Sequence, residues 1–100
     1  MKLCLKVHKT KRDFIVAVCD KDILNKKLKH PDFDFHVNPS FYFEKEAGEE
    51  EVLELLKSAT IVNLVGKKSV ETGIYAGIVS SDTVIMIGKV PHAQMVKILQ

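Results

Sequence analysis

Two apolar segments near the N-terminus, separated by a polar one, constrain the fold more than any other feature of the chain. Residues 2–7 (KLCLKV) show a period of two, and residues 14–19 (FIVAVC) form a run rich in β-branched side chains. Both patterns are typical of strands. Because the polar residues HKTKRD lie between them, the segments predict a β-hairpin with a basic tip.

Length and composition predict one globular domain. The chain has 100 residues, of which 46% are hydrophobic and 28% charged, enough for one core. No apolar stretch approaches the roughly 20 residues of a membrane span, and the charged start of the chain does not resemble a signal peptide. Cys4 and Cys19 lack a CxxC motif or a histidine at ligand spacing. We therefore expect no metal, a reducing cytoplasmic location, and two buried thiols in preference to a disulfide across the hairpin.

The middle of the chain mixes short helical and extended patterns. Asp20 and Asp22 precede ILNKKLKH, which predicts one helical turn that ends before Pro31. Residues 33–37 (FDFHV) return to a period of two and predict a third strand. Residues 41–43 (FYF) place three aromatic side chains in a row, so at least one of them must cover another element or contact a partner.

The segment from Gly48 to Gly66 carries the strongest helical pattern. Apolar residues recur at spacings of three and four, and glutamates gather at the N-terminal end, which predicts one amphipathic helix over residues 49–65. Gly66 is then expected to have a positive φ between two helices. The competing interpretation ends this helix at Ser58 and makes TIVNLV a strand.

Residues 69–99 predict a short helix and two strands. SVETGIYAG forms the helix, Gly73 within it indicates a close neighbour, and Gly77 ends it. A turn at residues 80–82 leads to strands over residues 84–88 and 93–99, with the loop GKVPH between them. The predicted fold class is α+β: a mostly antiparallel sheet of about five strands with two consecutive helices packed on one face.

Charge is segregated along the chain although the net charge is only +2. Residues 1–30 and 57–100 are basic, and residues 31–56 hold eight acidic residues against Lys45. This pattern indicates a basic face for a polyanion, an acidic face for a protein partner, or two faces that self-associate. A solvated surface on which the segments mix is an equal alternative.

Two segments offer candidate phosphate contacts. The hairpin tip, with Lys9, Lys11 and Arg12, is the densest basic cluster and suits contacts with a phosphate backbone. It lacks interleaved aromatic residues, so it does not indicate base stacking. Gly66-Lys67-Lys68-Ser69 lacks the upstream glycine of a Walker loop, but free N–H groups at a helix start and two ammonium groups attract an anion. The structural alternative is a simple joint in which Ser69 caps the second helix and both lysines are solvated.

Three polar residues near the C-terminal motifs are further candidates. Asn63 is expected to bond backbone at the helix junction or near Pro91. His92, with Gln94 close by, lies in the predicted loop and has a side chain that titrates near neutral pH. A hydrogen-bonded structural role and a functional role remain open for His92. If the two motifs form one site, His92 and Lys67 or Lys68 lie within reach of one anion.

The chain resembles a small archaeal family described as domain of unknown function number four hundred and twenty-four. The matching residues are NLVG (63–66), Val70, AGIV (76–79) and GKVPHAQ (88–94), with weaker matches at AVCD (17–20) and FY (41–42). The chain departs from the family pattern around FYFEKEAG, where a glycine is expected soon after FY. The resemblance implies an archaeal cytoplasmic protein with no established activity and suggests a connection with RNA or translation.

These observations lead to one functional hypothesis and two alternatives. The chain is predicted to be a non-enzymatic accessory protein that binds RNA or a ribonucleoprotein without a cofactor, through Lys9, Lys11, Arg12, Lys67, Lys68 and Lys89. The first alternative is a small enzyme, or a subunit of one, with His92 and Gln94 over an anion site at Gly66. The second is a protein–protein adaptor that uses FYF and the acidic start of the first long helix.

Overall fold

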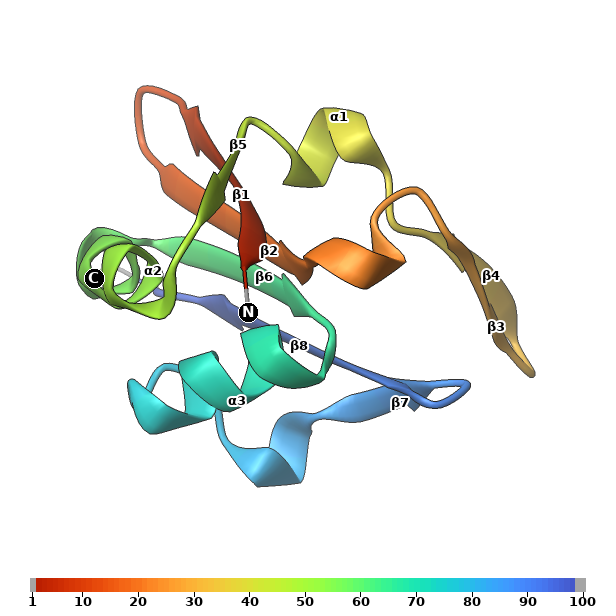
Figure 1. Ribbon diagram of the computed structural model, residues 1–100. Coiled ribbons are helices and arrows are strands. Elements are labelled where there is room, and N and C mark those ends of the chain that lie inside the picture. Colours follow the sequence, from red (N-terminus) through yellow and green to blue (C-terminus); the bar gives the residue numbers. More distant parts are fainter. Residues whose placement is uncertain (1, 99–100) are drawn as a thin grey trace.

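The computed structural model describes residues 2–98 and has the predicted α+β fold (Figure 1). Its main sheet has six strands in the order β5-β1-β2-β6-β8-β7. All neighbouring strands are antiparallel except β2 and β6, which are parallel. The strands are β1 (Leu3–Lys9), β2 (Phe14–Asp20), β5 (Lys45–Ala47), β6 (Ile61–Val65), β7 (Ile85–Ile87) and β8 (Val90–Val96).

Three helices and a separate two-stranded hairpin complete the fold. The hairpin consists of β3 (Lys27–His30) and β4 (Phe33–His36), and Figure 1 shows it extending away from the main sheet. The helices are α1 (Pro39–Tyr42), α2 (Glu49–Ser58) and α3 (Lys67–Tyr75), and short 3₁₀ helices span Lys21–Ile23 and Ser81–Thr83. None of the helices within residues 2–98 has the length and apolar character needed to cross a membrane.

The predicted N-terminal hairpin is confirmed and supplies two adjacent strands of the sheet. Strand β2 is buried over Val16–Asp20 because it lies between β1 and β6 and is covered on both faces. Cys4 and Cys19 are paired residues across the hairpin, and both are buried free thiols. Burial raises the pKa of both thiols, so they stay protonated and behave as small apolar groups.

The two faces of the sheet are covered by different elements. The helices α2 and α3 cover one face, where Val52, Leu56 and Val70 pack against the core side chains of the central strands. On the other face, Tyr42 from α1 and Val37 after β4 pack against Cys4, Ala17 and Cys19. The two longer helices therefore share one face, as predicted.

One predicted helix boundary is wrong. The helix starting at Glu49 ends at Ser58, and residues 61–65 form β6, a strand inside the sheet. Val62 and Leu64 are fully buried on the face under the helices, and Val65 is buried on the opposite face. A strand buried on both faces lacks a polar side, so Ala59 and Val62 matched the helical spacing by coincidence.

Other boundaries also differ from the predictions. The helical turn after Asp20 covers only Lys21–Ile23, and residues 27–30 form β3, which pairs with β4 outside the main sheet. Strand β8 begins at Val90, so the GKVPH segment is mostly strand and only Gly88 and Lys89 form the turn. The predicted end of the last strand, at Leu99, lies outside the described residues.

Pro91 is tolerated in β8 because the hydrogen bond that it cannot donate is not needed. Gly66 N donates to Pro91 O at 2.9 Å, but the carbonyl of Gly66 already accepts from Val70 N, at 2.9 Å, in the first turn of α3. A proline without an N–H group therefore fits where β6 gives way to a helix. Pro91, which predicted a loop, thus marks the place where the pairing of β8 with β6 ends.

Candidate functional site

The tip of the β1–β2 hairpin is an ordered turn. Thr10 N donates to Asp13 O at 2.9 Å, and the Thr10 hydroxyl oxygen accepts from Asp13 N at 2.9 Å and from Arg12 N at 3.3 Å. These bonds fix the backbone while the side chains of Lys11 and Arg12 remain exposed. The predicted basic tip therefore presents its cations from a defined backbone.

Thr60, just before β6, anchors the base of this turn to the centre of the sheet. Its hydroxyl donates to Asp13 Oδ1 at 3.0 Å and accepts from Phe14 N at 2.9 Å. The backbone adds a bond from Thr60 N to Phe14 O at 2.9 Å. A side chain 46 residues away in sequence thus holds the tip. No local sequence pattern indicates this contact.

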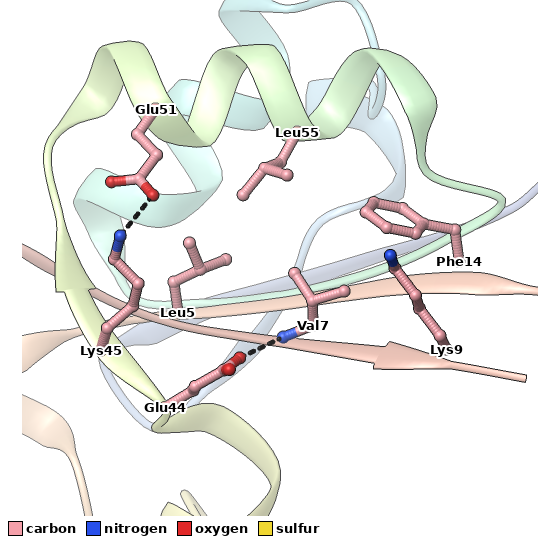
Figure 2. A pocket seen from close by; sticks show the side chains of 8 residues that line it. All are labelled: Leu5, Val7, Lys9, Phe14, Glu44, Lys45, Glu51 and Leu55. Atoms are coloured by element: carbon pink, nitrogen blue, oxygen red, sulfur yellow. Dashed lines mark hydrogen bonds and ion pairs between the residues drawn. The ribbon is translucent and has the colours of Figure 1, made fainter.

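Lys9 lies at the boundary between the tip and an aromatic side chain. Its ammonium nitrogen is 5.6 Å from the centre of the Phe14 ring, within the range of a cation–π contact, as Figure 2 shows. The tip therefore does have an adjacent aromatic residue. The Phe14 ring is partly buried against the core, so it steadies Lys9.

The tip carries one carboxylate, that of Asp13, beside its three cations. Within residues 2–98, no ion pair is formed by Lys9, Lys11 or Arg12, and Asp13 bonds to Thr60. By contrast, Lys68 lies 3.3 Å from Glu49 and Lys45 lies 2.6 Å from Glu51. The tip thus concentrates three exposed cations, none of which is ion-paired within the described part of the chain.

A groove of about 540 Å³ runs from the tip between β1 and α2. Its apolar walls come from Leu5, Val7, Phe14 and Leu55 (Figure 2). Its polar rim consists of Lys9 at the tip end and of Glu44, Lys45 and Glu51 at the other end. This groove was not predicted, because a strand and a helix about 50 residues apart in sequence form it.

The Gly66 joint has the predicted positive φ, at 111°, but it connects strand β6 with helix α3. The carboxylate of Asp20 caps that helix: Oδ2 accepts from Lys68 N at 3.0 Å, and Oδ1 accepts from Ser69 N and from the Ser69 hydroxyl, both at 2.8 Å. The N–H groups expected to be free for an anion are therefore bonded to a carboxylate of the chain. Ser69 lies inside α3 and is not its cap.

The surroundings of this joint also carry negative charge. Lys67 and Lys68 line a shallow pocket together with Asp20, Asp22 and Glu71. Although a strand does run into Gly66, the arrangement differs from a phosphate-binding loop because an internal carboxylate takes the place that a phosphate would take. The N–H groups of Lys68 and Ser69 at this joint are thus bonded without a ligand.

His92 lies in β8 and not in a loop. Its ring is buried, its Nδ1 donates to Leu64 O at 3.0 Å, and the Phe35 ring centre is 5.3 Å away. It is paired with Val65, whose side chain belongs to the core on the face opposite α3. Burial lowers the pKa of His92 below its usual value, which favours the neutral imidazole. The imidazole and the two lysines of α3 therefore do not converge on one anion.

Asn63 and Gln94 are paired across β6 and β8. The side-chain oxygen of Asn63 accepts from the Tyr42 hydroxyl at 3.4 Å, so its partner is an aromatic residue of α1 and not the expected backbone. Gln94 is exposed and is two residues from His92 along the same strand. Helix α3 ends at Tyr75, close to the stop predicted at Gly77, which has a φ of 74°.

The three aromatic residues 41–43 divide between the core and the surface. Tyr42 is buried, Phe41 stacks on His8 with ring centres 4.8 Å apart, and Phe43 is 42% exposed. The prediction that one of them covers another element is confirmed. Residues 2–98 contain no group of three His, Cys, Asp or Glu side chains that could hold a metal ion.

The register of the sheet places the predicted basic residues at two opposite ends. Because β6 runs parallel to β2, Gly66 lies near Asp20, at the end of β2 remote from the tip. Strand β8 is antiparallel to β6, which puts Lys89 and the β7–β8 turn at the Gly66 end. Lys9, Lys11 and Arg12 therefore form one cluster, and Lys67, Lys68 and Lys89 lie at the other end.

Comparison with known proteins identifies the family. A family model described as "Protein of unknown function (DUF424)" matches residues 8–98. The chain belongs to this family. The same fold occurs in the crystal structure of an uncharacterized conserved protein from Methanopyrus kandleri, with a TM-score of 0.80 and 25% sequence identity over 95% of this chain and 90% of that chain. No match was found among curated proteins.

Proposed function

We propose that the protein is a non-enzymatic accessory protein that binds RNA through the tip of the β1–β2 hairpin. The observation that carries this proposal is the cluster of Lys9, Lys11 and Arg12 on an anchored turn, where none of the three cations forms an ion pair within residues 2–98. Cations fixed on a turn contact the phosphate backbone without reading sequence. Because only three side chains make these contacts, the affinity is expected to be modest, as suits a protein that adds contacts to a larger ribonucleoprotein.

Two features favour the tip over the Gly66 end. The first is charge, because Asp20, Asp22 and Glu71 surround Lys67 and Lys68 and would repel phosphate. The second is the Asp20 cap, which occupies the helix N–H groups. The Gly66 end is thus expected to contribute little to the binding of RNA.

The test is the salt dependence of binding to a short single-stranded RNA oligonucleotide. Three phosphate contacts give a log–log slope of about 2, since each contributes about 0.7 for single strands. Replacing Lys9, Lys11 and Arg12 with glutamine should abolish most of that slope. The matched control replaces Lys67, Lys68 and Lys89 with glutamine, removes the same charge, and should leave most of the slope. An unchanged slope in the tip variant would refute the proposal.

A further inference from the structure

Strand β1 is paired with the edge strand β5 over only part of its length. Strand β5 pairs with Leu3–Leu5 alone, and the last backbone bond on this edge runs from Glu44 N to Leu5 O at 2.9 Å. Hydrogen-bonding groups alternate sides along a strand, so Val7 and Lys9 direct their backbone groups to the same edge as Leu5. Within the described part of the chain, no strand pairs with β1 there.

The Glu44 side chain occupies the first open hydrogen-bonding position of this edge, the amide of Val7. Val7 N donates to Glu44 Oε1 at 3.3 Å, a longer distance than is typical of a strand ladder. The carboxylate thus stands where the carbonyl of an added strand would accept. Because Glu44 is exposed, it can move aside without disturbing the core.

The groove beside this edge matches the side chains of an added strand. Residues that are directly opposite each other in a sheet share a face. A residue opposite Val7 would therefore point between Val7, Leu5 and Leu55, and a residue opposite Lys9 would lie beside its ammonium group (Figure 2). An apolar side chain suits the first position and a carboxylate suits the second.

We propose that the open part of the β1 edge binds an extended acidic peptide segment of another protein as an added antiparallel strand. Such a strand continues the antiparallel pairing that β5 begins. In an antiparallel strand the residue opposite Lys9 comes first, so the recognised pattern is an acidic residue, any residue, then an apolar residue. Lys11 and Arg12 extend the basic surface beyond Lys9 and attract further acidic residues that precede the pattern.

Charge argues against two other occupants. A second copy of the chain, paired antiparallel over Val7–Lys9, would place Val7 opposite Lys9 and offer its ammonium group no carboxylate. An RNA chain in the groove would meet Glu44, whose carboxylate forms no ion pair within residues 2–98. RNA therefore suits the tip, whereas the groove and the edge suit a peptide.

The probe is the blocked peptide acetyl-Thr-Glu-Thr-Val-Thr-amide, titrated into the ¹⁵N-labelled protein. Threonine is chosen for its extended preference. We expect the amide signals of Val7 and Lys9 to shift, and the reversed peptide Thr-Val-Thr-Glu-Thr and the lysine peptide Thr-Lys-Thr-Val-Thr to bind at least about 5-fold more weakly. Equal binding of all three peptides, or no shift at Val7 and Lys9, would overturn the proposal.

Variants sharpen the test. Glu44→Ala removes the internal competitor for Val7 N and should raise peptide affinity about 3- to 10-fold. Glu46→Ala, two residues further along the chain in β5 and outside the groove, is the matched control and should leave the affinity unchanged. Lys9→Glu should reverse the preference and favour the lysine peptide. A loss of affinity in Glu44→Ala would contradict the assigned role of the Val7 edge.

Two further outcomes would assign the edge to another occupant and overturn the proposal. One is a concentration-dependent shift of the Val7 and Lys9 signals without peptide, which indicates self-association. The other is a shift of the Leu5 and Leu55 methyl signals on addition of an RNA oligonucleotide and not of the peptide. Salt-dependent RNA binding by Glu44→Ala should match that of the unmodified protein, so the peptide and the RNA proposals can fail separately.

Discussion

At the scale of single residues, the contact of Gly66 with Asp20 requires glycine. A Cβ atom at Gly66 would lie 2.4 Å from Asp20 Cγ and 2.5 Å from Oδ1. The backbone of Gly66, with φ 111° and ψ 154°, also lies in a region that only glycine adopts readily. The residue therefore combines two requirements: the chain reversal from β6 into α3 and the room for the capping carboxylate.

Gly66→Ala is expected to lower the free energy of unfolding by about 2–4 kcal/mol, from the backbone cost and the displaced cap together. Gly77→Ala is the control, because Gly77 also has a positive φ, 74°, but a Cβ there would meet nothing within 4 Å. Urea unfolding should show a loss of only about 1–2 kcal/mol for the control. Equal losses would mean that contact with Asp20 is unimportant.

His92 makes the stability depend on pH. Its pKa in the folded protein is lowered, mainly by burial, so the unfolded chain takes up a proton first as the pH falls below about 6.5. The stability contributed by the neutral ring is therefore complete above that pH and is lost as the pH falls toward the folded pKa. This direction is opposite to that required for an imidazolium that binds an anion.

The prediction compares the protein with His92→Gln by chemical denaturation between pH 7.5 and 5. The stability of the unmodified protein should fall more steeply on acidification, by up to about 1.4 kcal/mol per pH unit, the limit for one proton. His92→Gln should lack this component. Parallel curves for the two proteins would show that His92 titrates alike in the folded and unfolded states.

At the scale of elements, Thr60 connects the hairpin tip to the central parallel pair of strands. Its hydroxyl bonds to Asp13 and to Phe14 at the start of β2. Its carbonyl oxygen accepts from Lys97 N, just after β8, at 2.7 Å. The ordered conformation of the tip therefore depends on β6, the strand that was predicted to be part of a helix.

Thr60→Val keeps the shape of the side chain and removes these hydroxyl bonds. It should lower the free energy of unfolding by about 1–2 kcal/mol and increase hydrogen exchange at the Phe14 amide. Thr83→Val is the control, because the Thr83 hydroxyl makes a single exposed bond to Ser80 O, and it should change the stability by less than about 0.5 kcal/mol. If Phe14 exchange were the same in Thr60→Val as in the unmodified protein, the anchoring role would be excluded.

The limits of prediction are also clearest at the scale of elements. Alternating or β-branched runs, as in residues 14–19, predict strands from the local sequence alone. Gly77 likewise predicts the end of helix α3. Residues 59–65 were assigned wrongly because a strand buried on both faces has no period of its own, and Ala59 extended the preceding helical stripe. The correct alternative rested on β-branched residues in TIVNLV, a weaker signal than periodicity.

The candidate sites were predictable only where they were local. The basic tip is a contiguous segment, so the sequence identified its cations. The Asp20 cap and the Glu44 contact with Val7 join residues 48 and 37 positions apart, and no local pattern reveals such a partner. The anion site at Gly66 was inferred from a correct local motif, but a distant carboxylate fills it.

At the scale of the whole molecule, the sheet places at opposite ends the basic residues that the sequence predicts to bind RNA together. The parallel pairing of β2 with β6 directs the tip and the Gly66 joint to opposite ends of the sheet. Acidic side chains surround the lysines of α3, whereas the cations of the tip form no ion pair within the described residues. The molecule is therefore expected to engage RNA from one end only.

The most direct measurement is an NMR titration of the ¹⁵N-labelled protein with a ten-nucleotide single-stranded RNA at low salt. The account predicts amide shifts over residues 8–14, which include Lys9, Lys11 and Arg12, and unchanged signals at Gly66, Lys67, Lys68 and Lys89. The shifts should disappear on addition of salt, since phosphate contacts release counterions. Shifts confined to the Gly66 end, or none at the tip when RNA is bound, would contradict it.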